Sequence, residues 1–215
     1  MINIIAKIKG KIHSADLHGQ KSLLQKARSI TAEQNAKGLG LKLHIGSGDL
    51  IINESWINID LEHCPTVDLS LNVLDGLPFE ENSVDFVYSE HFIEHLPKQG
   101  TKEFLGEVFR ILKPGGVHRI LTPDIRGCVN VFLADTWRQL GWTKHHGIET
   151  SADYLNQTMR LWGHQFLFDK ETLSKFVEHA GYADLTWENL SESRFPELRG
   201  IDTRTHSIIL DAVKA

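Results

Sequence analysis

The chain has 215 residues, of which 41% are hydrophobic and 24% charged, and its formal net charge is −5 at pH 7. These values are ordinary for a soluble globular protein, and no apolar run is long enough to cross a bilayer. The N-terminus lacks both the apolar core and the small-residue cleavage site of a secretory signal, so we expect a cytoplasmic protein.

The two cysteines, Cys64 and Cys128, follow no metal-binding or redox spacing. Two buried free thiols in a reducing compartment are favoured. A single disulfide between them stays open as the alternative.

Charge is distributed unevenly along the chain. Residues 1–40 hold seven Lys or Arg and two Asp or Glu, which leaves 16 basic and 26 acidic residues in the rest. Such a basic N-terminus is compatible with peripheral contact to an anionic membrane, or with a helix that packs on the acidic part of its own chain. The acidic body lacks the broad basic surface that nucleic acids require, so we expect no nucleic-acid partner.

In chain order, residues 1–40 are expected to form an N-terminal helical extension. Isoleucines among lysines indicate a short amphipathic segment over residues 1–18, and apolar residues three to four apart predict a helix over residues 20–36. Residues 41–49 then combine a buried strand with a glycine turn. Residues 56–60 form a second buried strand that ends in Asp60.

The middle of the chain continues this alternation of strands and helices. Extended segments are expected at residues 67–71 and 83–89, followed by a helix over residues 90–96 that Pro97 ends or kinks. An amphipathic helix over residues 101–112 has Thr101 as its N-cap. A Pro-Gly-Gly turn ends that helix, and the next strand covers residues 117–121.

Residues 123–165 interrupt the alternation and are rich in Trp and His. An insertion of this size after the fifth strand is usually a functional lid. Beyond it, Asp169 can cap a helix over residues 170–180 that ends at Gly181. Two closing strands are expected near residues 183–189 and 206–212.

The segment of residues 41–61 has the pattern of a site for a nucleotide-like ligand. Gly46 and Gly48 carry no Cβ, so the backbone can turn sharply and approach a ligand closely. Asp60, at the carboxyl end of the next strand, could accept hydrogen bonds from ribose hydroxyls. A nicotinamide-dependent oxidoreductase is disfavoured, because Ile51 stands where its third glycine is needed and residues 50–55 are too few for its crossover helix.

Six short motifs occur in one order and at one spacing. They are Leu-His-Ile-Gly-Ser-Gly at 43–48, Asn-Ile-Asp at 58–60, Leu-Pro-Phe at 77–79, Ser-Val-Asp-Phe-Val-Tyr at 83–88, Ile-Glu-His-Leu at 93–96 and Arg-Ile-Leu-Lys-Pro-Gly-Gly at 110–116. Together they resemble the class I S-adenosylmethionine-dependent methyltransferases, most closely small bacterial ones linked to glycan and polysaccharide biosynthesis. The resemblance implies that residues 41–215 form an α/β, Rossmann-like domain. Its seven-stranded sheet would be mostly parallel, with the last strand antiparallel and helices on both faces.

The same resemblance implies which residues hold S-adenosyl-L-methionine. Gly46 and Gly48 correspond to the loop under the methionine part of the cofactor, and Asp60 to the acid that binds the ribose diol. Asn72 and Val73 fall where the family places an acid and its neighbour against the adenine, and Asn72 departs from the usual Asp. Further implied contacts are His44, Ser47, Leu61 and, through its backbone, Ser89.

Methyl transfer to a hydroxyl requires a base, and a His with a pKa near neutrality is suited to that task. His91 and His95 follow the fourth strand and, four residues apart, would share one face of a helix. His164 lies at the end of the expected lid, and Asp124 ends the fifth strand. These four are the candidate catalytic or substrate-binding residues. For each, a capping or supporting role is the structural alternative.

His145 and His146 do not predict a metal site, because adjacent His side chains rarely chelate one ion unaided and no acid or Cys cluster has matching spacing. Trp137, Trp142 and Trp162 could stack on a sugar or ring, or form the lid core. We therefore expect a monomeric or homodimeric methyltransferase that acts on a small molecule or glycan, with oxygen favoured as the methylated atom and nitrogen as the second choice. The alternative is a methyltransferase-fold protein that binds the cofactor or a partner protein without catalysis.

Overall fold

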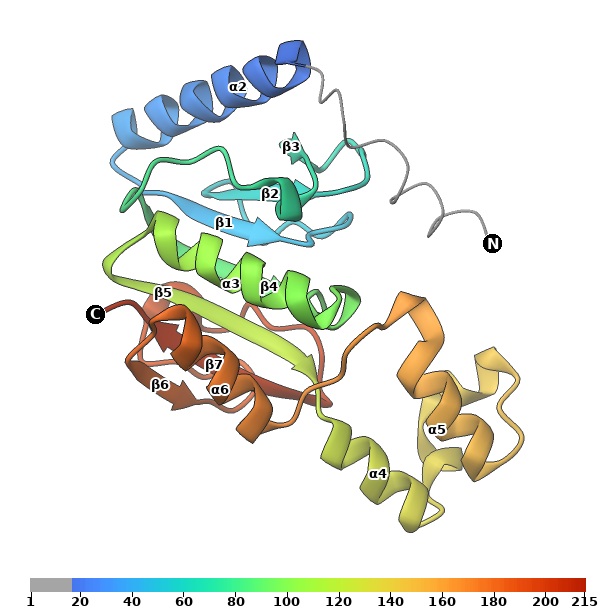
Figure 1. Cartoon of the computed structure of the whole chain (residues 1–215). Helices are drawn as coiled ribbons and strands as arrows, with labels where there is room; N and C mark the ends of the chain where they lie inside the picture. The colour runs from blue at the N-terminus through green and yellow to red at the C-terminus, as the bar shows by residue number, and fades with distance from the viewer. Residues whose placement is uncertain (1–16) are drawn as a thin grey trace.

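A computed structural model describes residues 17–215, and the segment expected at residues 1–18 lies almost wholly outside them. The described chain forms a seven-stranded sheet in the order β3-β2-β1-β4-β5-β7-β6 (Figure 1). β1 pairs in parallel with β2 and β4, β2 with β3, and β4 with β5. β7 runs antiparallel to both β5 and β6, which confirms the expected reversal of the last strand.

The strands lie close to the positions expected from the sequence. Their bounds are β1 Lys42–Ile45, β2 Trp56–Asp60, β3 Leu69–Ser70, β4 Val84–Glu90, β5 Leu112–Pro123, β6 Asp184–Trp187 and β7 Ser207–Val213. Strands β2 and β4 each contain two buried β-branched residues, which favour a pleated conformation. The expected Pro-Gly-Gly turn is instead the beginning of β5.

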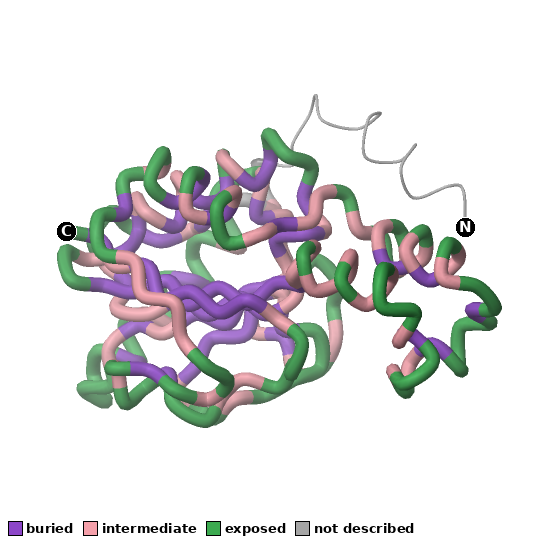
Figure 2. Tube along the Cα trace, turned by 90° about the horizontal axis from the view of Figure 1, so that it is seen from below, coloured by how far each residue is buried: buried purple, intermediate pink, exposed green. Residues whose placement is uncertain are grey.

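Side chains alternate between the two faces of the sheet. On one face, strand residues such as Leu43, Ile120 and Leu210 pack with α2 (Leu17–Ala36), α3 (Lys98–Ile111) and α6 (Lys170–Ala180). On the other, a smaller cluster around Tyr88 packs against residues 195–201, which contain the 3-10 turn η6 (Pro196–Leu198). The buried core therefore follows the sheet through the centre of the molecule (Figure 2).

Helix α6 begins and ends where the sequence predicts. The Asp169 carboxylate accepts a hydrogen bond from the backbone N–H of Thr172, 2.8 Å away, and so satisfies one of the free donors of the first turn. Gly181 ends the helix with φ +109°, a conformation that a Cβ would strain. A Cβ there would also meet the ring of Phe109 at 2.8 Å.

Two helix predictions are wrong. Residues 91–96 form no α-helix: His91 has φ +50°, and only a single 3-10 turn, η2 (Ile93–His95), follows. Helix α3 begins at Lys98 with Pro97 as its N-cap residue, so Thr101 lies inside the first turns. There its hydroxyl donates back to the carbonyl of Pro97. The earlier start buries Thr101 completely.

Residues 125–163 form a helical insertion beyond the end of β5. It contains α4 (Ile125–Leu133), α5 (Ser151–Arg160) and three 3-10 turns, and it projects away from the sheet (Figure 1). Its small core gathers around Trp137, Ile148 and Tyr154. Trp137 is thus packed inside the insertion. Among residues 17–215, no helix has the length and hydropathy needed to span a bilayer.

Buried charges tie residues 191–202 to the sheet. The guanidinium of Arg119 on β5 is fully buried and binds the carboxylates of Asp202 at 2.6 Å and Asp211 at 2.7 Å. It also donates to the carbonyl of Glu192. This charge network fixes the segment that covers the second face.

Candidate functional site

The turn after β1 is closed by hydrogen bonds to the end of β2. The backbone N–H groups of Gly46 and Ser47 donate to the carbonyl of Ile59, at 2.9 and 3.2 Å. Gly46 has φ +73° and Gly48 has φ +52°, which is the left-handed region that favours glycine. A Cβ on Gly46 would lie 2.5 Å from the ring of Phe92. The glycine turn therefore contacts the segment that follows β4.

Asp60 joins the glycine turn to the end of β2. Its carboxylate accepts hydrogen bonds from the N–H of Gly48 at 2.8 Å and the N–H of Glu62 at 3.0 Å. Each carboxylate oxygen keeps a further lone pair for a ligand hydroxyl. A Cβ on Gly48 would meet nothing within 4 Å, and the next residue, Leu61, is 65% exposed. Open space, a carboxylate and an exposed apolar side chain thus meet at this strand end.

The structure places the other predicted cofactor residues in different surroundings. Asn72 caps the 3-10 turn η1 (Val73–Asp75), because its amide oxygen accepts from the N–H of Leu74 at 3.1 Å. Val73 is buried. The hydroxyl of Ser89 is buried and lies 2.9 Å from Nε2 of His118, so Ser89 can offer a ligand only its backbone.

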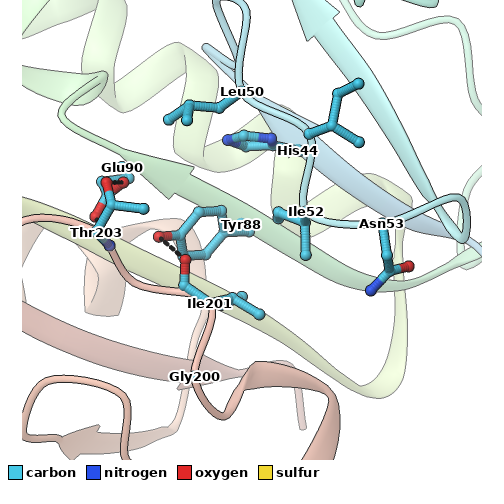
Figure 3. A pocket seen from close by; sticks show the side chains of 10 residues that line it. His44, Leu50, Ile52, Asn53, Tyr88, Glu90, Gly200, Ile201 and Thr203 are labelled. Carbon is cyan, nitrogen blue, oxygen red and sulfur yellow. Dashed lines mark hydrogen bonds between the residues drawn. The ribbon is translucent and has the colours of Figure 1, made fainter.

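His44 lies on the second face of the sheet, away from the helices. Its ring packs 5.2 Å from that of Tyr88, and burial lowers the pKa of His44 to about 4. Both rings line a pocket of about 240 Å³ between residues 50–53 and 200–203 (Figure 3). At its edge the Glu90 carboxylate accepts hydrogen bonds from the backbone N–H and hydroxyl of Thr203, at 2.7 and 2.6 Å.

A larger cleft of about 830 Å³ lies between the sheet and the helical insertion. All four predicted catalytic residues, His91, His95, Asp124 and His164, line this cleft. They lie directly after β4, in η2, at the N-cap of α4 and directly after the insertion. The tertiary fold thus brings together residues that lie up to 73 positions apart in the sequence.

His91 is held by contacts on both sides of its ring. Nε2 lies 2.8 Å from the hydroxyl of Ser207 on β7, and Nδ1 lies 3.7 Å from a carboxylate oxygen of Glu94. Burial lowers the pKa of His91 to about 4, with contributions from Arg204, His164 and His95. The imidazole is therefore neutral near pH 7 and has a lone pair to accept a proton.

His164 and Asp124 have defined hydrogen-bonding roles. Nδ1 of His164 lies 2.9 Å from the carbonyl of Thr158, so Nδ1 carries the proton and Nε2 the lone pair. Burial lowers the pKa of His164. Asp124 accepts from the backbone N–H of Arg126 at 3.0 Å and so caps α4 while it lines the cleft. This position is compatible both with capping of α4 and with contact to an acceptor.

Glu94 is a buried residue of this region that the sequence did not single out. Its side chain has no exposed surface, and burial raises the pKa of the carboxyl to about 7. One carboxylate oxygen accepts from the hydroxyl of Thr122 at 3.0 Å, and the other has no hydrogen-bond partner among residues 17–215. Glu94, His95 and His164 offer ligand-type atoms within 4.8 Å of one another. The adjacent Glu94 and His95 are residue types that bind metals, but the sequence does not show that His164 lies beside them.

Two of the three tryptophans considered as substrate contacts line the cleft. Trp162 is 52% exposed, and its ring centroid lies 5.4 Å from that of Trp142 and 5.7 Å from the ring of His164. Both tryptophans border the cleft, whereas Trp137 is packed in the insertion. The thiols of Cys64 and Cys128 are free and half-buried.

Comparison with known sequences finds similarity to methyltransferases over part of the chain. Residues 43–120 match a family model described as "Methyltransferase domain". A probable S-adenosylmethionine-dependent methyltransferase of Mycolicibacterium smegmatis is 43% identical over 60 residues, which are 28% of this chain and 23% of that protein. A demethylmenaquinone methyltransferase of Clavibacter sepedonicus is 29% identical over 134 residues, 58% of this chain and 50% of that protein. The chain thus spans at most half the length of these curated relatives.

Solved structures show the same fold. A methyltransferase from Archaeoglobus fulgidus, described as dependent on S-adenosylmethionine, superposes with a TM-score of 0.53 at 18% identity, over 89% of this chain and 93% of that one. A putative methyltransferase from Bacillus halodurans gives 0.51 at 14% identity, over 86% and 99%. The chain therefore has the Rossmann-like methyltransferase fold, and its residues 43–120 match a methyltransferase domain.

Proposed function

We propose that this chain is an S-adenosylmethionine-dependent methyltransferase that methylates an oxygen of a small-molecule or glycan acceptor bound in the 830 Å³ cleft. One observation supports this proposal above the others. Phe92 packs against Gly46, and Ile45 pairs with Ser89, so the glycine turn and the His-bearing segment after β4 are in contact. A cofactor on the turn and an acceptor in the cleft would therefore be neighbours.

The residues of the β1 and β2 ends fit the expected cofactor. Gly48 leaves open space beside the Asp60 carboxylate, which can accept hydrogen bonds from a ribose diol, and the exposed Leu61 can cover an apolar ring. Ser89 and the N-terminus of η1 offer backbone groups near the same edge. S-adenosylmethionine, when bound, supplies an electrophilic methyl group.

The cleft residues supply what an acceptor hydroxyl requires. The neutral imidazole of His91, or Nε2 of His164, can accept the hydroxyl proton as the oxygen attacks. Ser207 orients His91, and the carbonyl of Thr158 orients His164. Asp124 at the cleft wall can hold a second polar group of the acceptor. Positioning of the hydroxyl is expected to contribute as much to the rate as proton removal.

The aromatic side chains of the cleft favour a sugar or another ring as the acceptor. Trp142 and Trp162 present faces and edges on which an apolar ring face can pack while its hydroxyls stay hydrogen-bonded. This supports the glycan class among the small acceptors.

The test is methyl transfer from S-adenosylmethionine labelled at its methyl group. The full chain is incubated with separated fractions of bacterial small molecules, glycans, proteins and nucleic acids. We expect label in the small-molecule or glycan fraction in an alkali-stable linkage, as an ether requires. Label confined to protein or nucleic acid would contradict the proposed acceptor class. Cofactor binding with no transfer to any fraction would favour the non-catalytic alternative.

A further inference from the structure

We propose that Glu94, His95 and His164 bind one divalent transition-metal ion, with Zn²⁺ as the best-matched ion, in the wall of the large cleft. The three side chains offer a carboxylate oxygen and two imidazole nitrogens within 4.8 Å of one another. Two His and one Glu are a known ligand set for a zinc ion that keeps an open position. Binding of the ion does not require the proposed methyl transfer, whereas its role toward an acceptor rests on that function.

The distances are compatible with coordination after small side-chain rotations. Zinc bonds to His nitrogen and carboxylate oxygen are about 2.0–2.2 Å long, which places ligand atoms of a tetrahedral site roughly 3.4 Å apart. The observed upper limit of 4.8 Å is therefore closed by movements of about an ångström. His95 and His164 are half-buried and border the cleft, so both rings have room to turn.

The surroundings of Glu94 leave one of its carboxylate oxygens available as a metal ligand. One carboxylate oxygen is fixed by the hydroxyl of Thr122, and the other is buried without a hydrogen-bond partner in the described part of the chain. An unpaired buried carboxylate oxygen is costly, and a cation removes that cost. His91 does not satisfy it, because its Nδ1 is 3.7 Å away, which is too long for a hydrogen bond.

His164 is oriented in the way that metal ligands usually are. Its Nδ1–H donates to the carbonyl of Thr158 at 2.9 Å, which leaves Nε2 as the ligating atom. A ligating His commonly donates its other ring N–H to a carbonyl or carboxylate, which fixes the tautomer and the ring direction. The ring of His95 packs against His164 with centroids 5.0 Å apart.

The backbone holds the two ligand-bearing segments together. The carbonyl of Glu94 accepts hydrogen bonds from the N–H groups of Gln165 and Phe166, at 2.7 and 3.2 Å. The carbonyl of His95 accepts from the side-chain amide of Gln165 at 2.5 Å. Residues 94–95 and 164–166 are therefore clamped side by side, which gives the site a rigid base.

The donor set and the position of the site indicate its use. Imidazole and carboxylate ligands suit zinc and ferrous ions, and three protein ligands leave at least one position for an exogenous oxygen. His95 and His164 line the cleft beside Trp162, so an acceptor in the cleft would have access to that position. A bound ion would hold an acceptor oxygen and favour loss of its proton. His164 would then serve as a ligand, and His91 would remain as the base.

The site is tested by metal binding to the full, untagged chain after removal of metal with a chelator. Equilibrium dialysis with ZnCl₂ should give one ion per chain, and Co²⁺ should produce the visible absorption of a low-symmetry site. Glu94→Gln, which preserves the side-chain shape, and His164→Ala should each weaken binding at least about tenfold. A matched control, His145→Ala with His146→Ala, removes two exposed neighbouring His and should leave binding unchanged.

The proposal is overturned if the chain binds no Zn²⁺, or if only the His145 and His146 control loses binding. It is also overturned if Glu94→Gln and His164→Ala both bind like the wild type. Circular dichroism establishes that each variant is folded. Binding of S-adenosylhomocysteine is measured on the same samples. If the wild type does not bind S-adenosylhomocysteine, the proposed function is wrong. If it binds S-adenosylhomocysteine but no metal ion, only the metal site is wrong.

Discussion

Nε2 of His91 lies 2.8 Å from the hydroxyl of Ser207, which ties the end of β4 to the start of β7 across the intervening β5. The contact fixes a ring whose backbone has φ +50°, a conformation that is uncommon for residues other than glycine. Strained residues held by their surroundings are frequent at functional sites. The relationship therefore marks His91 as the candidate base to test first.

Substitution of His91 should separate turnover from cofactor affinity. His91→Asn keeps a side chain that tolerates the left-handed conformation but removes the base. We expect its methyl-transfer rate to fall by about 10²-fold or more, while its affinity for S-adenosylhomocysteine stays near that of the wild type. Steady-state rates and calorimetry on the same preparation measure both quantities. A wild-type rate in His91→Asn would remove His91 as the base.

The stability of the protein should decline below pH 6.5 because of buried neutral histidines. Burial lowers the pKa of His118 to about 3 and that of His44 to about 4, whereas both titrate near 6.5 when unfolded. Between these values the unfolded chain binds more protons, so the free energy of unfolding rises with pH and is fully developed above 6.5. Each group contributes a slope of about 1.4 kcal/mol per pH unit.

Urea unfolding at pH 7.5, 6.0 and 5.0 measures that slope. His118→Gln should reduce it by about 1.4 kcal/mol per pH unit in the range from 6 to 5. His179→Gln, an exposed His of α6, is the control and should leave the slope unchanged. Equal slopes in the wild type and His118→Gln would show that His118 is not held neutral.

Buried and exposed ion pairs of the molecule should differ strongly in their contribution to the free energy of unfolding. Arg119→Met leaves the carboxylates of Asp202 and Asp211 buried without their cation, and we expect a loss of about 3–5 kcal/mol. Arg126→Met breaks a pair with Asp169 in which the arginine is 70% exposed, and should cost less than about 1 kcal/mol. Comparable losses in urea unfolding of both variants would contradict the assigned burial of the Arg119 network.

Local sequence signals predicted the frame of the fold well. The alternation of apolar residues placed β2 at Trp56–Asp60, and Asp169 with Gly181 bounded α6, because these signals act through neighbouring backbone groups. The prediction of a helix over residues 90–96 failed for a tertiary reason. Phe92 packs against Gly46 of the glycine turn, and His91 turns left-handed.

The burial of polar side chains in the site could not be predicted from the sequence. Glu94 and His118 look like surface residues in a linear pattern, and only the packing of β4, β5 and their neighbours buries them. The histidines themselves were predicted as candidates, and the fold gathers them in one cleft. The sequence could not show that ligand-type atoms of His164 and Glu94 come within 4.8 Å of each other, because 70 residues separate them.

The most direct test of the central proposal is calorimetric titration of S-adenosylhomocysteine into the full chain, its Asp60→Ala variant and the control Asp49→Ala. Asp49 is an exposed acid beside the same glycine turn, so its loss changes the local charge without removing the carboxylate that binds Gly48. We expect binding to the wild type and to Asp49→Ala, and affinity weakened by about tenfold or more in Asp60→Ala, which corresponds to about 1.4 kcal/mol. Absence of binding to the wild-type chain would contradict the proposed cofactor site. Equal affinity in all three proteins would contradict the role of the Asp60 carboxylate in that site.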